Sequence, residues 1–384
     1  MNIINRSFWE IIGGKPVILY GMGNGADKII DYCAAKNIKI DDMFASDEFV
    51  RGHSFRGFDV KSLAQIKQIY NNNFCVLLSF AARHDPVINK IYSLADEYEM
   101  YVPNFPVFRE SNQADIYFDY NYYIKYKQEI YQAYDMLADA ESKRVFECVI
   151  NFNITGKLEY LREIESARES ALDLLDLQAG LDYIDIGAYD GDTIFEILNY
   201  KKDINKIYGL EPDIKNFNKL EKNLRENDLL DRCEIYNLGA WSEPDLLYFN
   251  AQANRNSSFR AEIDSAPTKT TRSDVGADSI SARERGIRSE VRVDSIDNLL
   301  GHKVSGEILI KYDVEGAEFE ALTGTREIIK KYSPKLIISL YHKIDDIFRL
   351  PVYIKSLNNN YKLYLRKHKY IPCWDLNLYA AAGS

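Results

Sequence analysis

The chain has 384 residues, a formal net charge of −10, 46% hydrophobic residues and 28% charged residues, which favours a soluble protein of two domains. It has neither an apolar run of about 18 residues nor a basic, cleavable leader, so we expect no membrane span, no secretion and a cytoplasmic location. The acidic balance argues against nucleic acid as the main partner, and five scattered cysteines without a CxxC pair favour reduced core thiols over a zinc site.

The amino-terminal part of the chain is expected to form a small Rossmann-like domain. The stretch PVILYGMGNGADKIIDYCAAKNI contains an apolar strand, a glycine turn and a helix with apolar residues three and four positions apart. Gly21, Gly23, Gly25 and the later acid Asp47 resemble a dinucleotide turn, but Asp27 at the helix start would repel a pyrophosphate. We therefore expect a scaffold or a substrate-presenting module in preference to a working NAD site.

The rest of the chain predicts a helical connector and a second α/β domain. Helical apolar spacing with few breakers continues through YKQEIYQAYDMLADAESKRVFECVINF, and strands such as YIDIG, KIYGLEP, EILIKYDVEG and PKLIISLYH then alternate with helices. The long polar stretch 250–292 is expected to be a mobile loop or lid. The predicted domains are 1–115, a Rossmann-like domain; 116–178, the helical connector; and 179–384, a second doubly wound sheet.

The segment YIDIGAYDGDT predicts a cofactor turn. In a doubly wound sheet, ligands bind beyond the carboxyl ends of the strands, and Gly187 and Gly191 would let a ligand approach the backbone closely. Asp185 and Asp190 would place acceptors at the rim, and with Asp192 they oppose the binding of a pyrophosphate. S-adenosylmethionine carries an ammonium and a sulfonium but no phosphate, so its charge fits an acidic turn.

Glu211 ends the next predicted strand, IYGLEPD, where a carboxylate can accept both ribose hydroxyls. A tight connection without a ligand would explain the glycines alone, but an acid in this register favours a cofactor site. The expected cofactor contacts are Asp185, Gly187, Ala188, Tyr189, Asp190, Gly191, Thr193, Glu211, Pro212 and Asp213.

These motifs resemble a known family. YIDIGAYDGDT, GLEPD and IKYDVEGAEFEAL, in this order and spacing, are similar to the FkbM-type family of S-adenosylmethionine-dependent methyltransferases, over about residues 142–382. The resemblance implies a class I methyltransferase fold for the C-terminal domain and methyl transfer to an oxygen, usually a hydroxyl of a sugar, a polyketide or another secondary metabolite. The implied partner is a small-molecule or saccharide acceptor, such as a nucleotide-linked sugar, and a homo-oligomer stays open.

The acceptor side is expected at two further strand ends. Asp313 and Glu315 follow the strand EILIKY and are expected to face the acceptor, and His342 follows LIISLY. Because histidine titrates near neutrality, His342 is the expected general base. Asp313 could equally be a helix N-cap, or hold a divalent metal ion, which the sequence does not establish. His368 is a second candidate for the same cleft.

Residues in the polar stretch offer further acceptor contacts. Ser257 and Ser258 could hydrogen-bond a polyol, and arginines such as Arg255 could bind an anionic sugar, although solvated loop charge explains them as well.

Two rival functions are a non-catalytic scaffold that presents a sugar nucleotide, and an NAD-dependent sugar-modifying enzyme that uses the amino-terminal turn. The first would show a degenerate cofactor turn, and the turn after YIDIG is not degenerate; the second would show a nicotinamide signal on binding of NADH.

Overall fold

The protein forms two compact units. The computed structural model describes residues 1–10, 12–105, 117–251, 258–260 and 287–383. The first unit consists of Met1–Leu174, Lys343–Lys355 and Lys362–Tyr379, and the second of Leu175–His342, Ser356–Tyr361 and Ala380–Ser384. Both units are discontinuous in sequence, whereas the three domains expected from the sequence are continuous, and that division stays a prediction.

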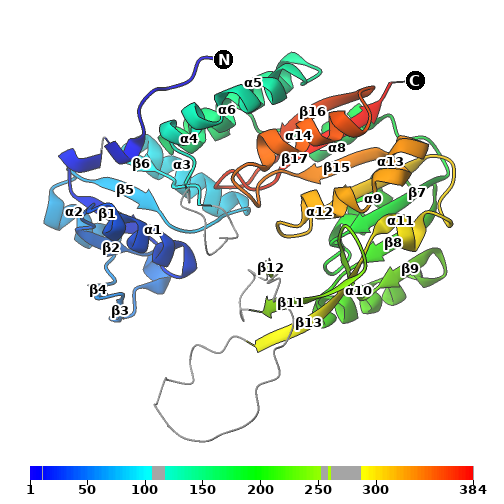
Figure 1. Ribbon diagram of the computed structural model, residues 1–384. Coiled ribbons are helices and arrows are strands. Elements are labelled where there is room, and N and C mark those ends of the chain that lie inside the picture. Colours follow the sequence, from blue (N-terminus) through cyan, green and yellow to red (C-terminus); the bar gives the residue numbers. More distant parts are fainter. Residues whose placement is uncertain (11, 106–116, 252–257, 261–286, 384) are drawn as a thin grey trace, which may run out of the picture. The chain divides into compact units, whose positions relative to one another are not determined.

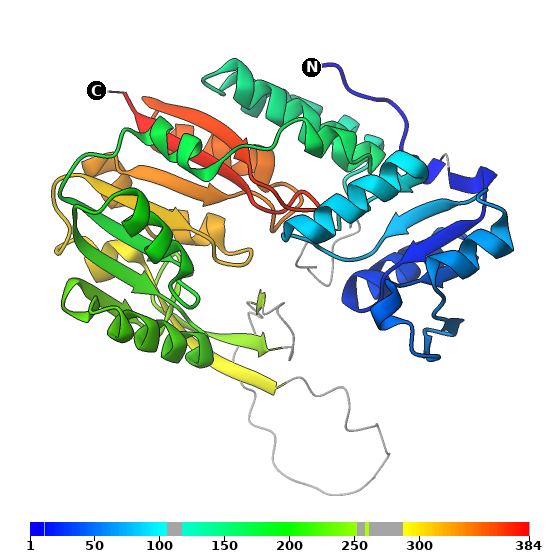
Figure 2. The same cartoon turned by 180° about the vertical axis from the view of Figure 1, so that it is seen from behind.

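The first unit contains a four-stranded parallel sheet of order β2-β1-β5-β6. Its strands are β1 (Val17–Tyr20), β2 (Asp42–Phe44), β5 (Cys75–Leu78) and β6 (Glu99–Tyr101), joined by α1 (Asn24–Ala35), α2 (Leu63–Tyr70) and α3 (Asp85–Glu97). Ile29 and Cys33 of α1 share a core with Val17 and Leu19 of β1. Helix α3 lies on the face of the sheet opposite to α1. Figure 2 shows this unit from behind. A short hairpin, β3 (Ser54–Phe55) and β4 (Phe58–Asp59), follows β2.

The segment predicted to be helical contains α4 (Tyr120–Lys125), α5 (Lys127–Asp135), α6 (Ala140–Thr155), α7 (Glu159–Arg162) and α8 (Arg168–Leu172). Helix α6 begins after Asp139, whose carboxylate accepts the Ser142 N–H, and ends at Gly156 in the left-handed conformation. Later in the chain comes α14 (Asp346–Leu357). No helix in the described part of the chain has the length and apolar character that a membrane crossing requires.

The second unit is built on a sheet of order β16-β17-β15-β14-β7-β8-β9, in which the five strands from β15 to β9 are parallel. The strands are β7 (Leu181–Ile186), β8 (Ile204–Leu210), β9 (Cys233–Tyr236), β14 (Ile308–Tyr312), β15 (Lys335–Ser339), β16 (Tyr361–Lys367) and β17 (Leu376–Ala382). Strands β16 and β17 are divided between the two units. The helices are α9 (Asp192–Tyr200), α10 (Ile214–Glu226), α11 (Ile296–Leu300), α12 (Glu318–Thr323) and α13 (Arg326–Tyr332).

The direction of winding reverses beside β7. The chain runs outward from β7 to β8 and β9, with α9 and α10 as the connections, and then returns to β14 on the other side of β7 (Figure 1). All residues of β7 and β14 are buried, as is usual for central parallel strands. The carboxyl ends of these two strands therefore form the switch point at which such sheets bind ligands.

A second, smaller sheet corrects part of the prediction for residues 250–292. Its strands are β10 (Gly239–Ala240), β11 (Asp245–Ala251), β12 (Ser258–Arg260) and β13 (Ile287–Asp294), in the order β10-β13-β11-β12. The end of the predicted loop is thus a strand. Val291 and Val293 are two positions apart, so their side chains lie on the same face of that strand, where both pack with Leu247 and Trp241. Residues 252–257 and 261–286 lie outside the described residues.

Candidate active site

The predicted cofactor turn follows β7 and lies directly against the end of β14. Gly187 has a φ of 86°, and a Cβ added to it would lie 2.0 Å from the carbonyl oxygen of Asp313. Any side chain at this position would therefore force the two strand ends apart. The glycine is required by the close approach of β7 and β14, quite apart from the room it leaves for a ligand.

The turn is further shaped by left-handed residues. Gly191 has a φ of 94° and precedes α9, and its N–H donates to the carbonyl of Ala188 at 2.8 Å. Tyr189 has a φ of 48°, and its side chain is exposed. The carbonyl of Asp190 accepts a hydrogen bond of 2.8 Å from the Asn223 amide, which joins the turn to α10.

Asp185 lies beneath the turn instead of at its rim. Its side chain is fully buried; Oδ2 accepts the Thr193 hydroxyl at 2.7 Å, and Oδ1 pairs with Lys311 Nζ at 3.2 Å. Asp185 is the fifth of six consecutively buried strand residues, so its side chain enters the protein interior. Because the side chain has no exposed surface, it supports the turn from the interior, and the rim position expected for this acid is corrected.

Lys311 is a central residue of the site that the sequence reasoning missed. Its Nζ lies 3.2 Å from Asp185 Oδ1, 3.4 Å from the Gly187 carbonyl and 3.7 Å from Asp313 Oδ2. Burial alone would lower the pKa of Lys311, but the attraction of Asp185 and Asp313 outweighs it and raises this pKa. The available signal was a lysine inside the otherwise apolar strand ILIKY.

Glu211 reaches the turn from the end of β8. Its Oε2 accepts the backbone N–H of Tyr189 and its Oε1 that of Asp213, each at 2.9 Å. Each carboxylate oxygen has two lone pairs, so each can also accept a ligand hydroxyl. Burial raises the pKa of Glu211 to about 7, although the two backbone hydrogen bonds oppose this.

Two exposed apolar side chains flank Glu211. Tyr189 is 44% exposed and Ile214, at the start of α10, is 55% exposed. The Lys219 ammonium lies 5.8 Å from the Tyr189 ring centre. Asp213, a predicted cofactor contact, caps α10 by accepting the N–H groups of Lys215 and Asn216. Tyr189 and Ile214 thus leave exposed apolar surface near Glu211 that a planar ring could pack against.

The acceptor side begins with Asp313, directly after β14. Helix α12 begins after Ala317, so Asp313 is not its N-cap. The Tyr341 hydroxyl donates to Asp313 Oδ1 at 3.1 Å, and His342 Nε2 lies 3.6 Å from the same oxygen. Burial would raise the pKa of Asp313, but Lys311 and His342 attract the carboxylate and lower it below its usual value.

His342 lies among carboxylates and is 1% exposed. Its Nδ1 lies 2.7 Å from Glu318 Oε1 and its Nε2 lies 3.4 Å from Glu315 Oε2. Burial opposes the charged ring, but the attraction of Glu318, Glu315 and Asp313 is stronger and raises the pKa of His342 to about 10. These charges favour the ring with both protons at neutral pH, which argues against the predicted role of His342 as the general base.

Glu315 presents its carboxylate at the surface of this cluster. Its backbone is left-handed, with a φ of 56°, and its side chain is 47% exposed. Partial burial of this half-exposed side chain, together with the charges of Asp313 and Glu318, raises the pKa of Glu315 to about 7, against the pull of His342. A half-exposed carboxyl that titrates near neutrality is suited to taking up a proton.

One group of ligand atoms in the cluster could hold a metal ion. Within the described ranges, Asp313, Glu318 and His342 each offer one such atom, and the three lie within 4.8 Å of one another. Oε1 of Glu318 already accepts the N–H groups of Val314 and Gly316 in addition to its contact with His342. A metal at this oxygen would have to displace those hydrogen bonds.

The remaining predicted contacts lie elsewhere. His368 is buried in the first unit, where Nδ1 is 2.9 Å from the Ser166 carbonyl and Nε2 is 2.7 Å from the Tyr379 hydroxyl. Both ring nitrogens are bound within the protein, so the assignment of His368 to substrate binding was wrong. Ser257 lies outside the described residues, and Ser258 is described only as part of β12.

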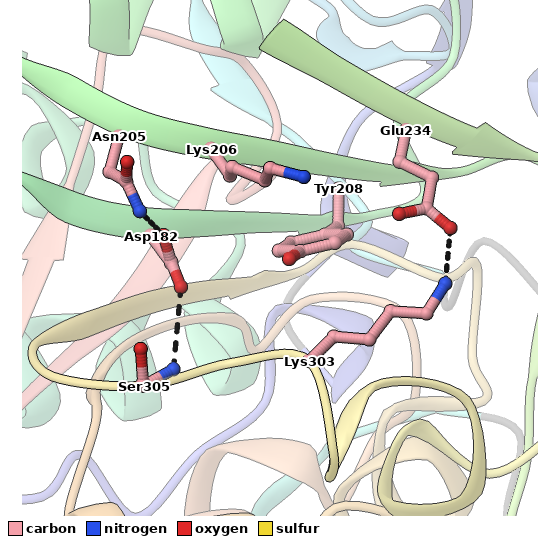
Figure 3. Close-up of a pocket in the computed structure, with 7 residues that line it drawn as sticks. All are labelled: Asp182, Asn205, Lys206, Tyr208, Glu234, Lys303 and Ser305. Carbon is pink, nitrogen blue, oxygen red and sulfur yellow. Dashed lines mark hydrogen bonds and ion pairs between the residues drawn. The ribbon is translucent and has the colours of Figure 1, made fainter.

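A polar pocket of about 420 Å³ lies at the opposite, amino-terminal edge of the strands (Figure 3). Asp182 accepts the Asn205 amide at 2.8 Å, and Lys303 pairs with Glu234. The first pair joins β7 to β8, and the second joins β9 to the segment between α11 and β14, which indicates a role in holding this end of the sheet together. The chemistry of the switch point lies at the other end of the same strands.

The comparisons with known proteins agree with this geometry. Residues 185–372 match the family model described as methyltransferase FkbM domain. The solved methyltransferase FkbM from Methylobacillus flagellatus KT is 19% identical, with a TM-score of 0.66 over 95% of this chain and 90% of that chain. At this identity the likeness shows a shared fold.

Two further solved structures overlap more weakly. An rRNA methylase from Streptococcus thermophilus is 12% identical, with a TM-score of 0.34 over 56% of this chain and 94% of that one. A Streptococcus mutans protein in complex with SAH is also 12% identical, with a TM-score of 0.33 over 56% of this chain and 98% of that one. A search of curated proteins finds no match.

Replacing Gly187 by alanine should lower the free energy of unfolding by about 2–5 kcal/mol, because the new Cβ meets the Asp313 carbonyl and the backbone is left-handed. Gly180→Ala is the matched control: its φ is 75°, but no atom lies within 4 Å of the added Cβ, so only about 1–2 kcal/mol of backbone strain is expected. Urea unfolding measures both. Equal losses in the two variants would contradict a close contact between β7 and β14.

Lys311→Met should lower the free energy of unfolding by about 3–5 kcal/mol, because it leaves two carboxylates without their shared cation. Adding Asp185→Asn to this variant should restore part of the loss, since the buried uncompensated charge disappears. The measurement is again urea unfolding, with the single Asp185→Asn variant included. A double variant no more stable than Lys311→Met alone would show that the ion pair does not dominate this site.

Proposed function

We propose that the protein, whose residues 185–372 match the family model described as methyltransferase FkbM domain, transfers a methyl group from S-adenosylmethionine to a hydroxyl, on a sugar or a saccharide-containing metabolite. The acceptor oxygen would form a bond to the methyl carbon as the sulfur–carbon bond breaks, and the hydroxyl proton would pass to the protein. The products are the methyl ether and S-adenosylhomocysteine. S-adenosylmethionine, when bound, supplies the electrophilic methyl carbon.

The meeting of Gly187 and Asp313 at the switch point carries this proposal. The predicted cofactor turn and the acceptor-side carboxylates follow two adjacent strands, β7 and β14, with Lys311 between them. Methyl transfer is an in-line displacement, so donor and acceptor must be held within contact of each other. A donor on the β7 side and an acceptor on the β14 side would meet this condition.

The residues beside the turn fit an adenosine. Glu211 keeps a free lone pair on each oxygen for the two ribose hydroxyls, while Tyr189 and Ile214 offer apolar surface to the adenine ring. Asp185 would act from below by fixing the turn. The residues that we propose for this side are Asp185, Gly187, Ala188, Tyr189, Asp190, Gly191, Thr193, Glu211, Pro212 and Asp213.

On the acceptor side we assign Glu315 as the residue that accepts the proton of the acceptor hydroxyl. Asp313 is held by Lys311, Tyr341 and His342, and its lowered pKa makes it a weak proton acceptor. Glu315 is more exposed and titrates near neutrality, which suits a general base. In this proposal Asp313 orients the acceptor hydroxyl, and the cationic His342 holds both carboxylates in place.

The direct test is an assay for S-adenosylhomocysteine with S-adenosylmethionine and a panel of sugars, glycosides and nucleotide sugars. A product heavier by one methylene group, with its methyl on oxygen by NMR, is the expected result. S-adenosylhomocysteine formation without any methylated hydroxyl, or a methyl on nitrogen or carbon, would contradict the O-methyl assignment.

Binding of S-adenosylmethionine should weaken about tenfold from pH 8 to pH 6, because protonation of Glu211, with its pKa of about 7, competes with the ribose hydroxyls. Glu211→Gln should bind at least about tenfold more weakly at pH 8, because it loses a charge-assisted contact, and should lose most of the pH dependence. Calorimetry measures both effects, with Glu221→Gln on α10 as the control. An unchanged affinity in Glu211→Gln would remove this residue from the cofactor site.

Glu315→Gln should lower kcat by about a hundredfold or more while the affinity for S-adenosylmethionine changes little, because the variant cannot accept the hydroxyl proton. In the parent enzyme, kcat should rise with pH through about 7 as Glu315 ionises. Steady-state rates across pH measure this, and Glu327→Gln, at an exposed position, is the control. A variant that keeps the parent rate and pH profile would exclude Glu315 as the base.

A further inference from the structure

Glu318 is a carboxylate in the interior of the second unit, at the start of α12, with no exposed surface. Its Oε1 accepts backbone N–H groups from Val314 at 3.0 Å and Gly316 at 3.4 Å. Its Oε2 is buried and has no hydrogen-bond partner among the described residues. A carboxylate buried in this way is costly unless an opposite charge compensates it.

The compensating charge is the ring of His342. Its Nδ1 lies 2.7 Å from Glu318 Oε1, the shortest of its contacts with carboxylates given above. Once Nδ1 is anchored, the direction of Nε2 is fixed as well, because the imidazole ring is rigid. That second nitrogen lies 3.4 Å from Glu315 Oε2 and 3.6 Å from Asp313 Oδ1. A single anchored ring thus contacts both carboxylates of the acceptor side.

We propose that Glu318 is a positioning residue, which anchors the His342 ring through Nδ1 so that Nε2 holds Glu315 and Asp313 in place for methyl transfer. This role rests on the proposed function, in which these two carboxylates serve the acceptor. Glu318 acts only through His342, since it is fully buried. The backbone bonds from Val314 and Gly316 in turn fix Glu318 to the same DVEG segment that carries Asp313 and Glu315.

The charges around His342 agree with this role. The acids that face the ring are Glu318 from α12 and Asp313 and Glu315 from the segment after β14. The Tyr341 ring packs against the imidazole at 4.1 Å between centres. Lys311 is the nearby cation, and it is paired with Asp313. Three acids against one further cation favour the protonated ring, and removing one acid should make the ring easier to deprotonate.

Glu318→Gln tests the proposal, because it keeps the side-chain shape and an acceptor oxygen but removes the charge. We expect the pKa of His342, followed by NMR of the five histidines, to fall by about one unit or more. We also expect kcat to fall at least about tenfold with the KM for S-adenosylmethionine unchanged. If the substitution only destabilised the protein, the melting temperature would fall but the pKa of His342 would not change. An unshifted His342 titration, or an unchanged kcat, would overturn the proposal.

His342→Gln provides the second measurement, and it also identifies the His342 resonance by its loss. It should lower kcat as much as Glu318→Gln does, and the double variant should lose little more, because the two residues act as one unit. Decreases in kcat that add up in the double variant would overturn the proposal. Perturbation of the His342 NMR signals by Zn²⁺ would also overturn it, because it would show that the ring binds a metal ion. The titration of His342 can be measured without any enzymatic turnover. If the His342 pKa shifts in Glu318→Gln but the parent protein transfers no methyl group, the proposed function is wrong while the pairing of Glu318 with His342 is still supported.

Discussion

Gly187 and the carbonyl of Asp313 approach so closely that no side chain fits between them. This contact joins the end of β7 to the end of β14 at the place where the winding of the sheet reverses. The turn that begins at Gly187 and the acidic segment that begins at Asp313 therefore lie side by side. Glu211 reaches the same turn from β8, through the pairing of β7 with β8 and its hydrogen bond from the Tyr189 N–H.

A line of alternating charges runs from beneath the turn to α12. Asp185 pairs with Lys311 at 3.2 Å, Lys311 lies 3.7 Å from Asp313, Asp313 lies 3.6 Å from His342, and His342 lies 2.7 Å from Glu318. Each buried charge thus has a neighbour of opposite sign, which is how a protein interior tolerates such groups. Charges held in this way need little rearrangement during reaction, and this preorganisation is the main electrostatic contribution that a site can make.

The sequence was sufficient for features that follow from strand order. Strand ends of parallel strands share one edge, so Glu211, Asp313 and His342 could be placed together from the ends of their strands alone. A lysine inside an apolar strand was a signal for Lys311, but the sequence does not show its partner Asp185, which lies 126 positions away. Glu318 gave no such signal, because its partner His342 follows a different strand. The protonation of His342 escaped for the same reason: histidine in isolation titrates near neutrality, and only the structure shows the three acids around it. His368 also ends a predicted strand, but its surroundings consume both ring nitrogens.

The central claim is that the turn after β7 receives the adenosine part of a methyl donor. The most direct measurement is a crystal structure of the protein soaked with S-adenosylhomocysteine. The account predicts density for the ligand beside Gly187, with the ribose hydroxyls on Glu211 and the base against Tyr189 or Ile214. A ligand bound at another place, or a turn that stays empty at saturating concentration, would contradict it.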